Sequence, residues 1–325
     1  MANAGRMDMD PVFEFGGMSA LWRIVDVLQA DREPPKHQWD ELLDSPGYIV
    51  LSSEFKPSFF KEKYRLAYKP SSEAAREKAV NMGDWYVKHY VDVAERRQGL
   101  EAWLINLEDR EDFMEGPVSK VREWIPSEVE GSPVVAFAVF DMDSRGYETI
   151  VIDPLFAMSL GTDFGDLLAH ELFHNVARRF YAYDPEKVEA NDGDIMWILR
   201  QLNEEGIADQ IFTLAYPSRD EHVADSPWVI QEMDRLIRRI AINENVGELS
   251  KMLRMTPPRA GHPTGHYMAK SIIEALGKER LLDTIGDPFG FIWAYDEAAK
   301  MRGLKSFSQE TLGYIDGLAM KYGGE

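Results

Sequence analysis

The sequence of 325 residues contains no cysteine. This absence excludes disulfide frameworks, cysteine nucleophiles, iron–sulfur clusters and zinc sites built on thiolates. Any metal ion bound by this chain must therefore be held by histidine, aspartate or glutamate side chains.

Basic residues are also few. The chain has 36 lysines and arginines against 56 aspartates and glutamates, which gives a formal net charge of −20. Binding to nucleic acid needs a basic surface that displaces counterions, and docking on anionic membranes needs one as well. The composition therefore predicts no nucleic-acid partner and no membrane partner, and we expect the acidic side chains to lie on a solvated surface.

Long apolar runs are missing too. The apolar segment Val134–Phe140 is far shorter than the roughly 20 residues of a membrane-spanning helix. Residues Met1–Pro11 lack the basic and apolar regions of a secretory signal. We therefore expect a cytoplasmic protein, or a secreted one if a leader peptide has been removed.

The residues that are present predict a folded, mostly helical chain, since 45% of them are hydrophobic and 11% aromatic. Two β-rich segments, Pro133–Phe140 and Thr149–Asp153, are joined by a polar turn and predict a hairpin. Helical periodicity precedes them at 16–30, 37–43, 71–98 and 113–124, and follows them at 162–181, 192–215, 226–243, 264–277, 288–301 and 308–321.

The pattern predicts an α+β fold, predominantly helical, with a small sheet before the second run of helices. We place a soft boundary between a helical N-terminal region, 1–130, and a catalytic region, 131–325, although one domain is an alternative. The polar turn Asp141–Gly146 resembles the start of a calcium loop. However, Ile152 occupies the position where such a loop needs a bidentate glutamate, so we interpret it as an ordinary turn.

The strongest chemical signal is the sequence His170-Glu171-Leu172-Phe173-His174. On a helix, residues four apart share a face, so both imidazoles can reach one metal ion. Glu171 lies about 100° around the helix, where it can touch a metal-bound water without binding the metal itself. This pattern predicts a metal site with His170 and His174 as ligands and Glu171 as general base.

A second signal follows in Asn203-Glu204-Glu205-Gly206-Ile207-Ala208-Asp209. Glu205 and Asp209 share an otherwise apolar helical face, where two carboxylates are costly to bury without a cation or hydrogen-bond donors. We predict Glu205 as the third ligand, with a fourth position left for water, and Asp209 as the acceptor for a ring N–H of a ligating histidine. Glu204 is the rival ligand, but its spacing from Arg200 favours a surface ion pair.

These two motifs together resemble the gluzincin metallopeptidases, in which a helix after the histidine motif offers a glutamate ligand and often an aspartate one turn later. The metzincin alternative fails because Ala177 and Phe180 stand where glycine and a third histidine are needed. The gap between His174 and Glu205 is longer than in the best-known gluzincins, which implies an insertion around Tyr183–Asp192.

The chain also resembles, more loosely, an uncharacterised bacterial family of zinc-dependent peptidases. The segment Trp39–Tyr48 near the N-terminus and Gly261–Met268 after the motifs carry this resemblance. It implies a zincin-like fold and a peptide or protein substrate.

In the predicted reaction, zinc activates a water, Glu171 takes its proton, and the water attacks a peptide carbonyl. The oxyanion then needs a donor besides the metal, and His266 and Tyr267 are our candidates. His262 is assigned to a loop, and the remaining histidines, His37, His89 and His222, are predicted to lie at the surface.

Two alternatives remain open. Instead of a peptidase, the chain could be a catalytically idle metal-binding protein that uses the fold to bind a partner. It could also be a hydrolase of small amides or esters. The presence of Glu171 argues against the idle protein, because a purely structural metal site needs no general base. The sequence leaves the substrate, the oligomeric state and a metal other than zinc undecided.

Overall fold

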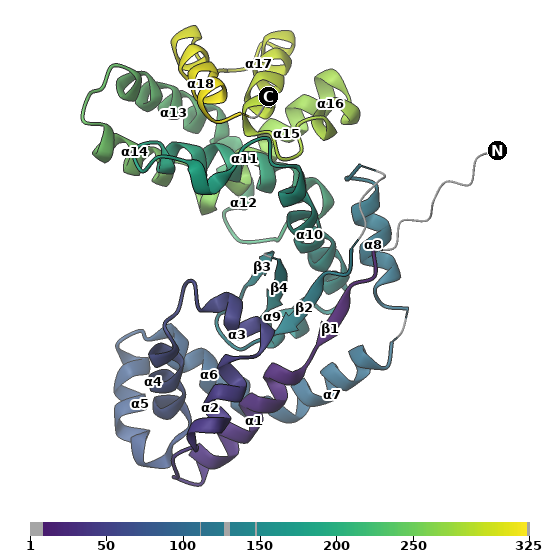
Figure 1. Ribbon diagram of the computed structural model, residues 1–325, viewed down its shortest axis with the longest axis vertical. Helices are drawn as coiled ribbons and strands as arrows, with labels where there is room; N and C mark the ends of the chain where they lie inside the picture. Colours follow the sequence, from purple (N-terminus) through teal and green to yellow (C-terminus); the bar gives the residue numbers. More distant parts are fainter. Residues whose placement is uncertain (1–8, 111, 127–130, 147, 324–325) are drawn as a thin grey trace, which may run out of the picture. The chain divides into compact units, whose positions relative to one another are not determined.

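The computed structural model describes residues 9–110, 112–126, 131–146 and 148–323, which divide into two compact units (Figure 1). The first unit comprises residues 1–119 and 128–175, and the second comprises 120–127 and 176–325. The divisions fall within helices α8 (Glu115–Arg122) and α10 (Phe164–Ala177). Among the described residues, no helix is both long and apolar enough to cross a lipid bilayer.

The first unit combines a small sheet with the helices before and after it. Its strands are β1 (Val12–Glu14), β2 (Val134–Phe137), β3 (Ser144–Gly146) and β4 (Thr149–Ile152). Its helices, besides α8 and α10, are α1 (Gly16–Gln29), α2 (Lys36–Leu43), α3 (Pro46–Leu51), α4 (Pro57–Tyr68), α5 (Glu73–Asn81), α6 (Trp85–Glu95), α7 (Arg97–Glu108) and α9 (Pro154–Leu160). The predicted predominantly helical α+β class with a small sheet is confirmed.

The sheet has the order β1-β2-β4-β3, in which only β3 runs antiparallel to its neighbour. The predicted hairpin between Pro133–Phe140 and Thr149–Asp153 is therefore wrong, because β2 and β4 pair in parallel, with Val134 opposite Thr149. The hairpin partner of β4 is β3, a strand formed by residues that we interpreted as a turn. The pattern of apolar residues marks a buried strand but does not reveal its direction.

Both faces of the central strands are covered. Residues 135–137 of β2 and 150–152 of β4 are fully buried, as expected for parallel strands between two helical layers. On one face, α3 approaches so closely that a Cβ at Gly47 would lie 3.1 Å from the Ala138 Cβ. On the other face, the Phe137 ring packs 5.8 Å from Trp103 of α7 and 6.4 Å from Phe164 of α10. This packing sets α10 against the sheet.

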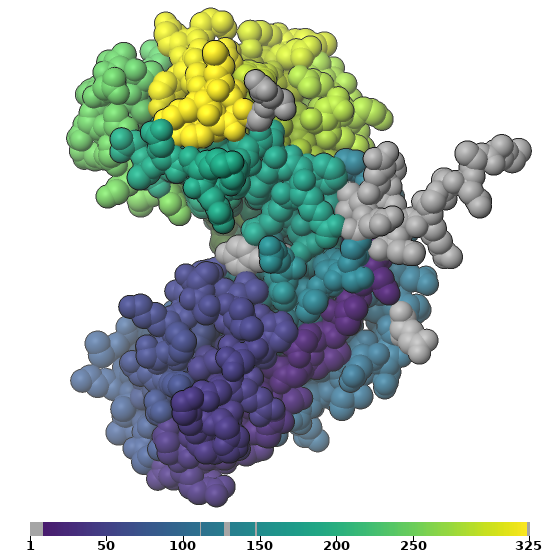
Figure 2. Space-filling model, viewed as in Figure 1, coloured from purple at the N-terminus to yellow at the C-terminus, as the bar shows by residue number. Residues whose placement is uncertain are grey.

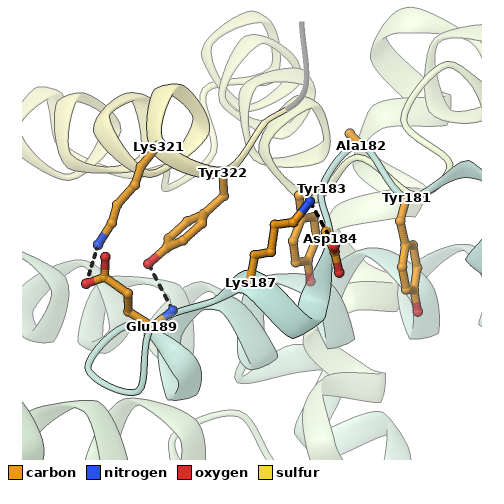
Figure 3. Close-up of a pocket in the computed structure, with 8 residues that line it drawn as sticks. All are labelled: Tyr181, Ala182, Tyr183, Asp184, Lys187, Glu189, Lys321 and Tyr322. Carbon is orange, nitrogen blue, oxygen red and sulfur yellow. Dashed lines mark hydrogen bonds and ion pairs between the residues drawn. The ribbon is translucent and has the colours of Figure 1, made fainter.

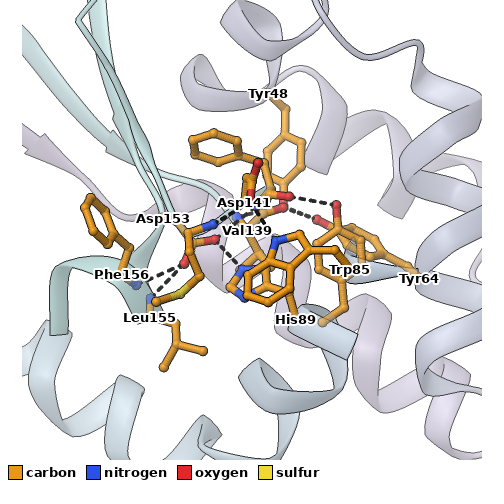
Figure 4. Close-up of polar contacts among 12 residues, drawn as sticks. Tyr48, Tyr64, Trp85, His89, Val139, Asp141, Asp153, Leu155 and Phe156 are labelled. Atoms are coloured by element: carbon orange, nitrogen blue, oxygen red, sulfur yellow. Dashed lines mark hydrogen bonds and ion pairs between the residues drawn. The ribbon is translucent and has the colours of Figure 1, made fainter. Parts of the chain in front are cut away.

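Beyond β2, the backbone leaves the sheet ladder and its polar groups bind side chains instead (Figure 4). The Tyr64 hydroxyl donates to the carbonyl oxygen of Val139 at 2.7 Å and lies 2.6 Å from the Tyr48 hydroxyl. Burial raises the pKa of Tyr64 well above its usual value, so the phenol remains a donor. The tyrosines of α3 and α4 thus satisfy backbone groups that would be costly to bury alone.

Asp153 is the most deeply buried charged residue in this region, with no exposed surface. Its Oδ2 accepts from the Phe140 backbone N–H at 3.1 Å and contacts His89 Nε2 at 2.8 Å. Its Oδ1 caps the N-terminus of α9 by accepting from Leu155 and Phe156. Desolvation raises the pKa of Asp153, while the hydrogen bond to His89 acts in the opposite direction. This carboxylate ties the sheet, α6 and α9 together.

The prediction that His89 lies at the surface is wrong, since only 2% of the residue is exposed. Its partner Asp153 lies far away in the sequence and could not be paired with it from periodicity.

The predicted single helix over 71–98 is also divided. Gly83 adopts a left-handed backbone with φ of 84°, and the Asp84 side chain then caps α6 by accepting from the Val87 N–H. In Figure 2 the side chains of α1–α6, in purple and blue, form one continuous surface.

Among its described residues, the second unit consists of helices and loops, with an isolated bridge between Tyr183 and Gly323. Its helices are α11 (Gly193–Ile211), α12 (Arg219–Ala224), α13 (Ser226–Ala241), α14 (Val246–Met255), α15 (His262–Leu276), α16 (Lys278–Leu282), α17 (Pro288–Arg302) and α18 (Gln309–Tyr322). Helix α11 lies at the centre, packed against α14, α15 and α17.

The closest helix pair in this unit is α11 with α15, which meet at two glycines. A Cβ at Gly206 would lie 2.7 Å from the Gly265 carbonyl oxygen, and a Cβ at Gly265 would lie 2.5 Å from the Leu202 carbonyl oxygen. Only glycine allows two helix backbones to approach this closely. The crossing brings the start of α15 beside the second half of α11.

The predicted boundary at residues 130 and 131 stays a prediction, and residue 130 lies outside the described part of the chain. Contacts group the strands with the N-terminal helices, because β1 pairs with β2 and α3 packs against β4.

We expect Asp153→Ala to lower the free energy of unfolding by about 3–5 kcal/mol, because it leaves a buried histidine and three backbone donors without their acceptor. Chemical denaturation of the purified protein measures this change. Asp109→Ala, at an exposed position, is the control and should change the value by less than about 0.5 kcal/mol. Equal effects of the two substitutions would contradict the role of Asp153.

We expect Gly265→Ala to destabilise the second unit by about 1–3 kcal/mol, since the added methyl group meets the Leu202 carbonyl oxygen. Gly313→Ala, in the exposed part of α18 where nothing lies within 4 Å, is the matched control. It should be neutral or stabilise the helix by about 0.5–1 kcal/mol. Denaturation curves of the two variants would run against this interpretation if Gly265→Ala were the more stable.

Candidate functional site

Helix α10 carries the His-Glu-x-x-His motif in the first unit. It begins at Phe164 and ends at Ala177, inside the predicted range, because short 3₁₀ turns flank it at Gly161–Asp163 and Arg178–Phe180. His170 and His174 are buried, and their Nε2 atoms lie 3.0 Å apart. Two nitrogen ligands of a tetrahedral zinc ion, at bond lengths of about 2.0–2.1 Å, lie about 3.3 Å from each other. The helix therefore aims both nitrogens at a common point.

Glu171, the predicted general base, is also buried, with 5% of the residue exposed. Its Oε1 accepts a hydrogen bond from the Ser144 hydroxyl of β3 at 2.6 Å. Two residues along the same strand, a Cβ at Gly146 would lie 2.6 Å from Glu171 Oε2 and 2.7 Å from the His174 Cβ. The edge strand thus passes directly over the motif, and our sequence analysis did not identify Ser144 or Gly146 as part of this site.

The remaining predicted ligand belongs to the second unit. Glu205 and Asp209 lie one turn apart on α11, with 12% and 3% of their side chains exposed. His262, the first residue of α15, contacts both of them. Its Nδ1 lies 3.1 Å from Asp209 Oδ1 and its Nε2 lies 3.3 Å from Glu205 Oε2.

Assigning His262 to a loop was wrong, since it starts a helix. The sequence signal that could have placed His262 on a helix is its spacing of four residues from His266. Gly265, between the two histidines, lies at the helix crossing. Asp209 accepts from this histidine, and whether it also serves a metal-ligating histidine stays a prediction.

The hydrogen bond to Asp209 determines how the His262 ring is protonated. Because a carboxylate only accepts, Nδ1 carries the proton, and in the neutral ring Nε2 presents a lone pair toward Glu205. Two acceptors that face each other at 3.3 Å need a positive charge between them, either a proton on Nε2 or a bound cation. For the Nε2 atoms of His170 and His174, either a hydrogen bond from one neutral ring to the other or a bound cation accounts for their separation.

The predicted ion pair of Glu204 with Arg200 is present, but placing Glu204 at the surface was wrong. Only 6% of this residue is exposed, and the Tyr181 hydroxyl donates to its Oε1. Arg200 Nε lies farther from the same oxygen, at 3.9 Å. Burial, followed by the Glu204 charge, raises the pKa of Tyr181, which keeps the phenol a donor. The Glu204 carboxylate therefore accepts from Tyr181, whereas Glu205 accepts from Gln201 through Oε1 and faces His262 through Oε2.

The two candidate oxyanion donors lie on α15. His266 Nδ1 lies 3.0 Å from Gln210 Nε2, and its Nε2 lies 3.4 Å from an Arg219 nitrogen. Burial lowers the pKa of His266, so the neutral ring is favoured. Tyr267 packs 6.3 Å from the ring of Tyr295 on α17. Their catalytic roles stay predictions.

A pocket of about 530 Å³ opens elsewhere in the second unit, between the predicted insertion and α18 (Figure 3). It is lined by Tyr181, Ala182, Tyr183, Asp184, Lys187, Glu189, Lys321 and Tyr322. Lys321 bonds Glu189 at 2.8 Å and Asp192 at 2.9 Å, which fastens the insertion to the last helix. None of the predicted ligands lines this pocket, so it is separate from the site.

The donor atoms in both units suit zinc. Imidazole nitrogen and carboxylate oxygen are ordinary zinc ligands, and each unit brings two such atoms close together. Glu171 follows His170 directly in the motif, and one of its carboxylate oxygens is held by Ser144.

Comparison with curated proteins and with solved structures gives no match. A comparison with protein families does give one. Residues 39–303, well over half of the chain, match the family DUF5700, which is described as "putative zinc dependent peptidase". The matched range contains the motif on α10, both carboxylates of α11 and the start of α15. The chain belongs to this family.

Proposed function

We propose that this protein is a zinc-dependent peptidase of the gluzincin type with a zincin-like catalytic region. His170, His174 and Glu205 bind the zinc ion, and Glu171 is the general base. The observation that carries the proposal is the pair of Nε2 atoms 3.0 Å apart beside a buried glutamate, in a family whose description names zinc and peptidase activity.

When bound, zinc would supply a Lewis acid that lowers the pKa of water and polarises the substrate carbonyl. Glu171 accepts a proton from the attacking water and later donates it to the leaving amine. Asp209 holds the His262 ring so that its Nε2 faces Glu205. His266 and Tyr267 remain the proposed donors to the oxyanion.

The substrate that we propose is a peptide or protein. Neither β2 nor β4 offers a sheet edge along which an extended peptide could lie, because each is paired on both sides. The edge strands are β1 and β3, and β3 passes over Glu171.

We expect Glu171→Gln to lower turnover of a quenched peptide library by about 10²–10⁴-fold, because the amide cannot take the proton from water. Zinc content, measured by elemental analysis, should stay unchanged. Glu115→Gln, at an exposed position of α8, is the control and should keep full activity. Zinc binding without any Glu171-dependent turnover would favour the catalytically idle protein, and turnover of small esters or amides alone would favour the small-molecule hydrolase.

We expect Glu205→Gln to weaken zinc binding by more than the roughly 10–100-fold that loss of an outer-shell partner costs. Competition with a chelating dye measures this affinity. Glu204→Gln is the matched control, because its amide oxygen still accepts from Tyr181 and the zinc affinity should be kept. The opposite ranking would assign the third ligand to Glu204.

A further inference from the structure

The contact between β3 and Glu171 assigns a role to a residue outside the motif. We infer that Ser144 is a positioning residue, whose hydroxyl holds the Glu171 carboxylate in the orientation needed to accept a proton from water. This inference rests on the proposed function, because it presumes that Glu171 is the base.

The strand geometry directs Ser144 at the helix. Side chains of alternate strand residues point to the same face, so Ser144 and Gly146 share the face toward α10 while Arg145 lies on the other. The hydroxyl donates to Glu171 Oε1 at 2.6 Å, and the missing side chain at Gly146 leaves room for Oε2. The strand therefore contacts both oxygens of the carboxylate, one through a donor and one through close packing.

The backbone of Ser144 is itself held in place. Its N–H donates to Asp143 Oδ1 at 2.9 Å, and it lies opposite Ile152 in the pairing of β3 with β4. Just before the strand, the Asp143 carbonyl oxygen accepts from the Asp153 N–H at 3.1 Å. The hydroxyl is thus attached to a fixed backbone, so little conformational entropy is lost when it is positioned.

Arg145 braces the same strand from its opposite face. Its guanidinium contacts the carboxylates of Asp143 and Glu54 and lies 5.5 Å from the centre of the Phe140 ring. At the far end of β3, the Asn175 side chain of α10 donates to the Glu148 carbonyl oxygen at 2.9 Å. The short edge strand is therefore anchored on both sides of Ser144.

In this arrangement the two carboxylate oxygens of Glu171 have different roles. Oε1 accepts from Ser144, which fixes the plane of the group, and Oε2 is the oxygen that takes the proton when water attacks. A carboxylate without this hydrogen bond would rotate among several orientations, and only some of them would point a lone pair at the water.

The test compares Ser144→Ala with Ser144→Thr in the full-length, zinc-loaded protein, using a quenched peptide that the wild type cleaves. We expect Ser144→Ala to lower kcat about 10-fold with KM changed less than about twofold, because the lost bond acts on the reacting group. Ser144→Thr keeps a hydroxyl and should restore most of kcat. Ser159→Ala, which removes a part-buried hydroxyl bound to the Phe156 carbonyl oxygen, is the matched control and should leave kcat unchanged.

A second readout does not depend on activity. In metal-free protein with ¹³C-labelled glutamate, Glu171→Gln identifies the side-chain carboxylate signal of Glu171. We expect Ser144→Ala to shift that signal and Ser144→Thr and Ser159→Ala to leave it in place.

The outcomes separate this inference from the proposed function. Wild-type turnover that depends on Glu171, together with full kcat and an unshifted signal in Ser144→Ala, would overturn the inference alone. A loss of kcat that follows a fall in thermal stability and is not rescued by threonine would also overturn it, since Ser144 would then be structural. Absence of Glu171-dependent turnover in the wild type would instead overturn the proposed function.

Discussion

Where β3 crosses α10, no room is left for a side chain at residue 146. The environment of Glu171 and His174 on α10 depends on this close contact. Because the strand backbone lies against Glu171 and His174, it shields both from solvent while Ser144 supplies a hydrogen bond. The position of β3 follows from its pairing with β4, and that of β4 from its parallel pairing with β2. The surroundings of the motif are therefore determined by strand register as much as by the motif itself.

The second unit uses a similar device with helices. Gly206 and Gly265 let α11 and α15 approach until their backbones nearly touch, which places His262 against Glu205 and Asp209. Both units thus bring polar groups together at points where glycine removes a side chain. Such contacts are sensitive to single methyl groups, because a packed interior has little space to yield.

The sequence predicts the parts of this protein that depend on local patterns. The helical class, the two buried strands and the motif on a helix all follow from residue periodicity and spacing. It does not predict features that depend on distant partners. The sequence around His89 is typical of a surface helix, but its partner Asp153 is distant in the sequence. His262 likewise contacts Asp209 of another helix, which its local sequence does not reveal.

Other errors come from single residues with special backbone conformations. Gly83 ends one helix and Asp84 begins the next, although the apolar spacing continues across both. The direction of β2 relative to β4 was not predicted correctly because the last three residues of the polar turn, Ser144–Gly146, form a strand too short to be recognised from composition. The third metal ligand stays a prediction, and the Tyr181 bond to Glu204 favours Glu205 for that role.

The strand order also affects how the first unit folds. β1 comes from the start of the chain and pairs with β2 near the end of the unit, while β4, the last strand to be synthesised, inserts between β2 and β3. Parallel pairing between distant segments is slow, so the open edge of β2 stays exposed to other nascent chains until residue 152 has left the ribosome. The excess of acidic over basic side chains among residues 1–152 opposes their association during this interval, because like-charged chains repel one another.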